Sequence, residues 1–242
     1  MACSFCATGQ AGFDRHLTSG EIIEQVVRAM REAAPTRVSN IVFMGMGEPM
    51  ANFDATWTAI ERIHDDIGIG ARSLTVSTVG LIPGIRRLTE QELPVTLAVS
   101  LHAANDELRN ELVPINRRYP LDDLADALND YRQARRRRVS FEWAMIDGVN
   151  DSDRDAAELA HYARRVRAHI NLIPLNPTPG YPVVGSSKRT IHRFRDQLED
   201  AGVEASVRNT RGVDIDAACG QLAARVINSD STPVTLSPGP TN

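Results

Sequence analysis

Cysteine and long apolar runs are the two features that this chain of 242 residues has least of. It contains 3 cysteines, an odd and small number that excludes a disulfide framework and favours a reducing, cytoplasmic setting. No run of about 18 apolar residues occurs, so we expect neither a membrane-spanning helix nor a membrane partner. The first residues lack the charged and apolar regions of a secretory signal, so we expect none.

Lysine is almost missing too, because Lys188 is the single lysine and every other basic side chain is an arginine. This bias is typical of GC-rich coding, and it lowers the weight of any arginine cluster as a sign of function. The formal charge of −4, from 27 basic and 31 acidic residues, argues against a protein that binds nucleic acid over its whole surface. For the four arginines at 135–138, we therefore favour a solvated helix end over a contact with RNA phosphates.

Short apolar runs alternate with amphipathic helical patterns along most of the chain. The runs predict strands at 40–44, 73–77, 95–101, 139–145 and 170–174, with 204–207 as a candidate sixth. The helical patterns cover about 19–30, 53–65, 121–135, 152–167 and 189–201, and Ser19 is the expected cap of the first. A last helix is expected to begin at Asp214 or Asp216 and to reach Ile227, followed by a disordered tail at 228–242.

Strands that are separated by single helices predict an α/β fold with a parallel sheet and outer helices. Five or six such units are too few for a closed eight-stranded barrel, so we expect an open, partial TIM-type barrel. In barrels of this kind, the loops after the carboxyl ends of the strands carry the chemistry. Here these loops are polar or rich in glycine and proline, and they lie at 45–49, 77–78, 100–102 and 174–177.

Two of the cysteines, Cys3 and Cys6, form a C-x-x-C pair. By its spacing alone, the pair is compatible with zinc, an iron–sulfur cluster, a redox dithiol or coincidence. Zinc would need a second ligand pair, and the nearest histidine, His16, has no partner nearby in the sequence. A thioredoxin-type dithiol would follow a strand, and we predict no strand before Cys3.

The neighbourhood of these cysteines resembles a known family. Cys3-Ser4-Phe5-Cys6 is similar to the C-x-F-C part of the cluster loop of radical S-adenosylmethionine (SAM) enzymes, and Gly47-Glu48-Pro49 resembles their motif for the SAM amino group. Further segments resemble, in the same order, the RlmN-type adenine carbon-2 RNA methyltransferases: Ser100-Leu101-His102-Ala103, Val113-Pro114-Ile115-Asn116, 171–177, Thr210-Arg211-Gly212 and 216–222. The resemblance makes 1–227 a radical SAM core domain that lacks its first strand, and it leaves 228–242 as a tail.

The resemblance also implies roles for individual residues. Cys3 and Cys6 would be the second and third ligands of a [4Fe–4S] cluster, and Cys219 would be the thiol that first accepts a methyl group. SAM would be bound by Gly47 and Glu48 at its amino group and elsewhere by the remaining site residues: Ser77, Ser100, Leu101, His102 and Asn176.

Each role has a plainer alternative. Glu48 could cap the next helix or pair with an arginine, and His102 could be a structural histidine at a strand end. Ser77 and Asn176 could be ordinary turn residues, and Cys219 could be a small buried thiol. For any one of these residues taken alone, the plainer alternative is favoured. For all of them together it is disfavoured, because every one of the residues lies at a predicted strand exit or in the matching C-terminal motif.

The implied reaction methylates carbon 2 of an adenine in 23S rRNA and in some tRNAs. One SAM would methylate the Cys219 thiol, and a second would be cleaved reductively to a radical that activates this methyl group. The implied partners are RNA and an electron donor such as flavodoxin or ferredoxin. Related carbon-8 methyltransferases carry alanine where this chain has Pro49, which favours the carbon-2 type.

The same scheme needs five cysteines, whereas this chain has 3. The first cluster ligand would lie four positions before Cys3, and the resolving cysteine would lie further upstream. We therefore expect a chain that is truncated at its start and inactive as written. A non-catalytic SAM- or RNA-binding remnant and a small zinc-binding domain stay open as alternatives.

Overall fold

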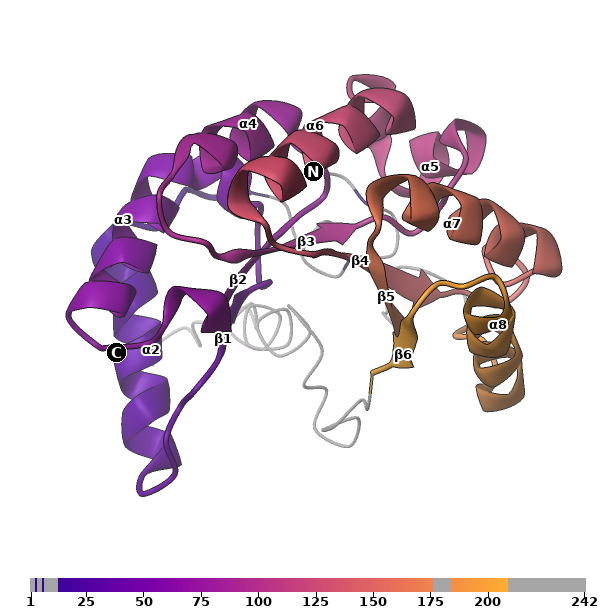
Figure 1. Cartoon of the computed structure of the whole chain (residues 1–242). Helices are drawn as coiled ribbons and strands as arrows, with labels where there is room; N and C mark the ends of the chain where they lie inside the picture. Colours follow the sequence, from indigo (N-terminus) through magenta and orange to yellow (C-terminus); the bar gives the residue numbers. More distant parts are fainter. Residues whose placement is uncertain (1–2, 4–5, 7–12, 176–183, 209–242) are drawn as a thin grey trace, which may run out of the picture.

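The computed structural model describes Cys3, Cys6 and residues 13–175 and 184–208, in which a single curved sheet carries helices on its outer side (Figure 1). The sheet has 6 strands in chain order, and every neighbouring pair is parallel. The strands are β1 (Ile41–Phe43), β2 (Leu74–Thr78), β3 (Thr96–Ser100), β4 (Val139–Met145), β5 (His169–Pro174) and β6 (Ala205–Val207). The sheet does not close, so the predicted open, partial barrel is confirmed.

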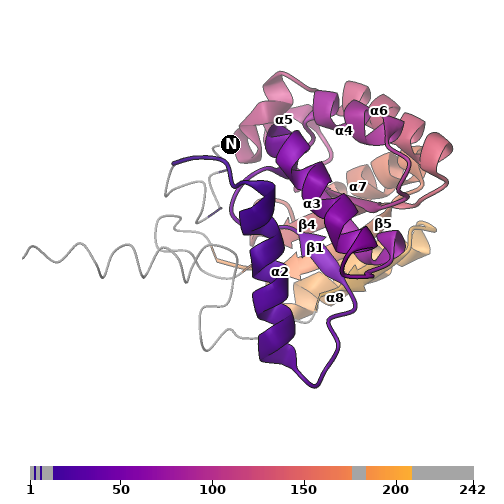
Figure 2. The ribbon, with the colours of Figure 1, turned by 90° about the vertical axis from the view of Figure 1, so that its left-hand side faces the viewer.

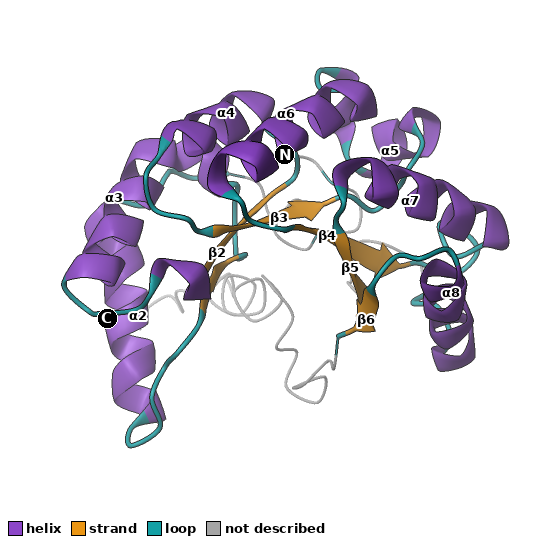
Figure 3. Cartoon of the chain, in the orientation of Figure 1, coloured by secondary structure: helices purple, strands orange, loops and turns teal. Residues whose placement is uncertain are grey.

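The helices lie along the convex side of the sheet (Figure 3), and α2 stands beside the β1 edge (Figure 2). They are α2 (Ser19–Ala33), α3 (Phe53–Asp65), α4 (Ile82–Glu90), α5 (Asp106–Leu112), α6 (Leu121–Arg135), α7 (Asp153–Val166) and α8 (Lys188–Asp200). Three short 3-10 helices accompany them: η1 (Pro49–Asn52), η2 (Ala71–Ser73) and η3 (Pro114–Arg117). No helix in the described ranges is long and apolar enough to cross a membrane.

The hydrophobic core fills the space between the sheet and these helices. In β4, Phe141 stacks against Tyr162 of α7 with ring centroids 5.5 Å apart, and Trp143 packs against Phe194 of α8. Because side chains alternate along a strand, Glu142, the residue between them in β4, points to the opposite, concave face. The register of the sheet therefore decides which polar side chains share that concave face.

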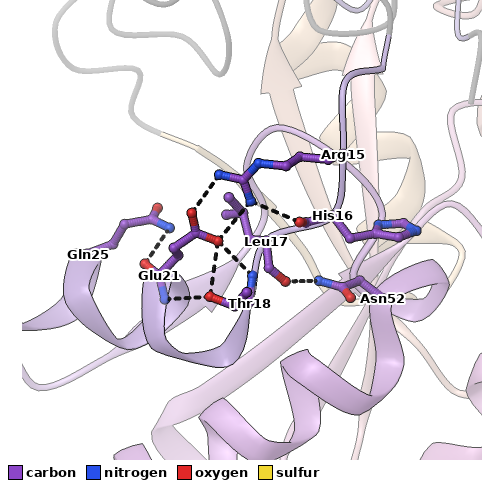
Figure 4. Close-up of polar contacts among 7 residues, drawn as sticks. All are labelled: Arg15, His16, Leu17, Thr18, Glu21, Gln25 and Asn52. Atoms are coloured by element: carbon purple, nitrogen blue, oxygen red, sulfur yellow. Dashed lines mark hydrogen bonds and ion pairs between the residues drawn. The ribbon is translucent and has the colours of Figure 1, made fainter.

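A capping box starts helix α2 (Figure 4). The Thr18 hydroxyl accepts from the Glu21 amide, and the Glu21 carboxylate accepts from the Thr18 amide at 2.8 Å. Arg15 pairs with the same carboxylate at 2.6 Å, and Asn52 donates to the Leu17 carbonyl at 2.8 Å. The cap is thus Thr18 and not Ser19 as predicted, because only Thr18 has the extended backbone that turns its hydroxyl onto the first turn.

Two short helices, α4 and α5, were not among the predicted elements. Pro83 lies in the first turn of α4, where the backbone N–H that proline lacks would have no partner within the helix. A Cβ on Gly84 would lie 2.4 Å from the Met50 Cβ, so this helix packs closely on η1 through a glycine. Helices of 9 and 7 residues are too short to show a clear apolar period.

Three of the arginines at 135–138, namely Arg135, Arg137 and Arg138, contact the protein itself. Arg137 donates to Thr96 Oγ1 at 2.6 Å, and Arg138 pairs with Glu204. They lie between the end of α6 and the start of β4, at the amino ends of the strands. This arrangement agrees with the preferred interpretation of the run as a helix end.

Candidate functional site

Cys3 and Cys6 pack over the carboxyl ends of the strands. They share an apolar cluster with residues that follow four strands, which are Val79, Ala103, Ile146 and Leu175. Cys3 is buried and Cys6 is half-buried, both thiols are free, and the Cys6 amide donates to the Cys3 carbonyl at 3.3 Å. Burial, with the neighbouring Cys6 as a smaller cause, raises the pKa of the Cys3 thiol to about 11. The pair is therefore held in an apolar shell beside the loops in which the chemistry was predicted.

The donor set suits a soft metal. Two thiols that lie close together fit either zinc or the iron of an iron–sulfur cluster. Among the described residues, no group of three or more His, Cys, Asp or Glu side chains comes together as metal ligands. The described residues therefore provide no second ligand pair for a zinc site. The two thiols fit as part of the ligand set of an iron–sulfur cluster.

Glu48 joins the β1 exit loop to the end of β2. Its carboxylate accepts from the Met50 amide at 3.0 Å, which caps η1, and from the Val79 amide at 2.9 Å. Burial raises the pKa of Glu48, and these hydrogen bonds oppose the rise. The carboxylate thus makes the capping contact of the plainer alternative. Beside it, Gly47 adopts a φ of 128°, which side chains of other residues rarely permit.

Ser77 and Ser100 lie at the carboxyl ends of two adjacent strands, β2 and β3. Thr75 and Thr96 line a hollow on the concave face. Because residues two and four positions apart share a face, Ser77 and Ser100 point to that same face. Both serines therefore face the interior of the open barrel, as a ligand-binding role requires.

Leu101 and His102 make the β3 exit turn. The Leu101 side chain is fully buried in the core, and its amide donates to the Glu142 carbonyl at 3.0 Å. His102 has a left-handed backbone with a φ of 60°, and its Nδ1 accepts from the Ala144 amide at 3.0 Å. Burial, helped by the charge of Arg109, lowers the pKa of His102 to about 3. The ring is therefore neutral at pH 7 and carries its proton on Nε2.

Two positioning residues have no predicted role. Arg109 is fully buried and donates to the carbonyls of Val79 at 2.7 Å and Leu101 at 3.1 Å, so it ties the β2 and β3 exits together. Asn150, also fully buried, donates to the carbonyls of His102 at 2.9 Å and Ala144 at 2.8 Å. Neither residue carries a local sequence signal, because each acts through main-chain carbonyls of distant segments.

Asn176 and Cys219, together with the expected helix that ends at Ile227 and the tail at 228–242, lie outside the described residues. Their predicted roles stay predictions. The structure brings together the other site residues, Cys3, Cys6, Gly47, Glu48, Ser77, Ser100, Leu101 and His102, at the carboxyl ends of the strands.

Residues 1–160 match the family model of the Radical SAM superfamily. The chain belongs to this superfamily. It is 52% identical over 240 residues to a probable dual-specificity RNA methyltransferase RlmN of Chloroflexus aurantiacus, covering 93% of this chain and 64% of the relative. The dual-specificity RNA methyltransferase RlmN 1 of Myxococcus xanthus is 48% identical over 230 residues, again covering 93% of this chain and 64% of the relative. The radical SAM chain described here thus spans less than two thirds of the length of these relatives.

Solved structures agree with the radical SAM fold. A radical SAM methyltransferase from Sphaerobacter thermophilus is 52% identical and superposes with a TM-score of 0.88, over 91% of this chain and 66% of the other. SuiB of Streptococcus suis, bound to S-adenosylmethionine, is 12% identical with a TM-score of 0.59 over 86% of this chain and 44% of the other. At that identity, SuiB supports the fold alone.

Proposed function

We propose that this chain forms the SAM- and cluster-binding part of an RlmN-type RNA methyltransferase of the cytoplasm. Its product would be an adenine methylated at carbon 2 in 23S rRNA and in some tRNAs. The observation that carries the proposal is the thiol pair Cys3 and Cys6, which packs over the exits of parallel strands beside the Gly47-Glu48 loop. Relatives about half identical in sequence that bear the RNA methyltransferase name support it.

In this proposal, Cys3 and Cys6 hold a [4Fe–4S] cluster, and SAM binds beside it. When bound, the cluster supplies the electron for reductive cleavage of SAM, with flavodoxin or ferredoxin as the source. The residues of this chain bind and orient the cofactor. Gly47 and Glu48 meet its amino group, and the rest of the pocket is formed by the polar strand exits: Ser77, Ser100, Leu101, His102 and Asn176.

The hydrogen bonds of the exit loops indicate which site residues would contact SAM through the side chain and which through the main chain. The Glu48 carboxylate already accepts two main-chain amides, so it supports the proposed site by fixing the loop that presents the Gly47 and Glu48 backbone. His102 presents a neutral ring whose Nε2 carries the proton. Cys219 is proposed as the methyl-accepting thiol, which gives the methyl group a covalent carrier before it reaches RNA.

The proposal is tested by the RNA product. The chain is reconstituted anaerobically with iron, sulfide, SAM and a reductant, and a 23S rRNA fragment or tRNA is added and digested for mass spectrometry. Because the proposed reaction needs five cysteines and this chain has 3, we expect no methylated adenosine from the chain alone. When the chain is joined to the N-terminal part of an RlmN relative that supplies the other two cysteines, we expect 2-methyladenosine, and we expect it to disappear in Cys219→Ser. Formation of 8-methyladenosine would instead indicate the carbon-8 type, and SAM binding by the joined chain without any methylated RNA would favour a non-catalytic remnant.

A further inference from the structure

A row of polar side chains crosses the concave face of the sheet. The register pairs Ser100 of β3 with Glu142 of β4, Glu142 with Asn171 of β5, and Asn171 with Ser206 of β6. Since Phe141 and Trp143 point to the helices, Glu142 points to the concave face, and the residues level with it share that face. The row thus begins at Ser100, a proposed SAM residue, and continues onto β4, β5 and β6.

Glu142 is the unusual member of this row. It is 5% exposed, and burial raises its pKa. Its Oε1 accepts from Asn171 Nδ2 at 2.8 Å and from Ser140 Oγ at 3.4 Å. No donor among the described residues bonds to Oε2, and Glu142 lines a hollow of about 610 Å³ on the concave face. Oε2 is not among the fully buried atoms that lack a partner, so it is open to a ligand that brings its own donors.

The neighbours of Glu142 hold it in one orientation. Asn171 Oδ1 accepts from Ser206 Oγ at 2.7 Å, and this hydroxyl lies 2.9 Å from His169 Nε2. The Asn171 amide is thereby fixed with its NH₂ group towards Glu142. A carboxylate that is oriented before binding loses little freedom when a ligand arrives.

We propose that Glu142, oriented by Asn171, accepts hydrogen bonds from the ribose hydroxyls of SAM and so fixes the nucleoside half of the cofactor. This inference rests on the proposed SAM site. A buried carboxylate that accepts from ribose hydroxyls is an established solution in nucleotide-binding proteins. With the methionine half of SAM near Cys3, Cys6 and Gly47, the nucleoside extends past Ser100 towards β4.

The charges of the hollow favour a nucleoside over a nucleotide at this position. Three arginines line the hollow: Arg137 and Arg138 are engaged by Thr96 and Glu204, and the charge of Arg208 acts on Glu142 itself, where it opposes the rise in pKa. A phosphate beside Glu142 would meet a carboxylate, whereas the hydroxyls of ribose are neutral donors. SAM carries no phosphate, so its nucleoside half matches this part of the face.

The test compares ligands with and without ribose hydroxyls on the full chain. Binding of SAM, 5′-methylthioadenosine and 2′,3′-dideoxy-5′-methylthioadenosine is measured by calorimetry for the unchanged protein, Glu142→Ala, and Glu92→Gln as an exposed control. We expect the unchanged protein and Glu92→Gln to bind the dideoxy ligand about tenfold more weakly than the parent, the size of effect of a hydrogen bond to a charged group. Glu142→Ala should bind both ligands equally and weakly, and its circular dichroism and thermal midpoint show whether it is folded.

The outcomes separate the two proposals. Equal discrimination against the dideoxy ligand in Glu142→Ala and in the unchanged protein would overturn the role of Glu142 and leave the SAM site standing. If Glu142→Ala does not fold, Asn171→Ala serves instead, because it frees the carboxylate and should reduce the discrimination without abolishing SAM binding. Failure of the unchanged protein to bind SAM or 5′-methylthioadenosine at all would overturn the proposed SAM site, and the inference with it.

Discussion

His102 illustrates, at the scale of the residue, how burial fixes a protonation state. The residue is 6% exposed, its backbone is left-handed, and its Nδ1 accepts from the Ala144 amide. Protonation would remove this acceptor and place a second positive charge near the buried Arg109 guanidinium, whose own pKa burial lowers to about 10. The folded protein therefore takes up the proton on His102 far less readily than the unfolded chain does.

The pH dependence of stability should reflect this difference. The pKa of His102 falls from an ordinary 6.5 to about 3 on folding, so its contribution is complete above pH 6.5 and is lost as the pH falls from 6.5 towards 3. His102→Asn keeps an acceptor and tolerates the left-handed backbone, but it does not titrate. Between pH 7 and pH 5, the unchanged protein should lose about 2 kcal/mol more unfolding free energy than His102→Asn, as urea denaturation would measure. Parallel losses in both proteins would contradict the assignment.

At the scale of the element, two neighbouring hydroxyl residues at the start of α2 have different roles. Thr18 closes the capping box with Glu21, whereas Ser19 is the first residue of the helix (Figure 4). The sequence offers both as caps, and only the local backbone conformation distinguishes them. Arg15 adds an ion pair to the Glu21 carboxylate of the cap, and Asn52 attaches the segment before the cap to the start of α3.

Substituting these two residues tests the capping assignment. Thr18→Ala should lower the unfolding free energy by about 1 kcal/mol, because it removes the acceptor of the Glu21 amide. Ser19→Ala, the matched control, should change the unfolding free energy by less than about 0.5 kcal/mol, since Thr18 and not Ser19 supplies the capping hydroxyl. Urea denaturation followed by circular dichroism measures both. A larger effect at Ser19 than at Thr18 would restore the cap predicted from the sequence.

At the scale of the whole molecule, the sheet gathers residues from distant parts of the chain onto one edge. Cys3 and Cys6 meet segments that follow β2, β3, β4 and β5, because parallel strands end at the same side of a sheet. Arg109, Asn150 and Glu48 then lock the exit loops to one another. The proposed site is therefore a property of the assembled sheet.

Metal binding distinguishes the three cysteines. After anaerobic reconstitution, Cys3→Ser and Cys6→Ser should each lose most of the bound iron and sulfide, because each removes a thiolate ligand. Cys219→Ser, the matched control, should retain the iron of the unchanged protein, because its proposed role is in methyl transfer. Iron and sulfide analysis, together with the visible charge-transfer absorption, provides the measurement. An equal iron content in all three variants would contradict the assignment of Cys3 and Cys6 as cluster ligands.

The sequence by itself determined the strands, most of the helices and the motif loops, because apolar periodicity and turn residues are local signals. The parallel order followed from the single helices between strands. The sequence could not predict α4 and α5, which are too short to show a clear apolar period. It also could not decide whether Thr18 or Ser19 is the N-cap of α2.

Only the tertiary structure decided which groups the site residues touch. The Glu48 carboxylate bonds to the amide of Val79, 31 positions away, and Asn150 bonds to the carbonyl of His102, 48 positions away. Glu142 became a candidate only through the register that sets it beside Ser100 and Asn171. The physical reason is that buried polar groups must find partners wherever the packed sheet brings donors and acceptors together, and no local pattern encodes that meeting.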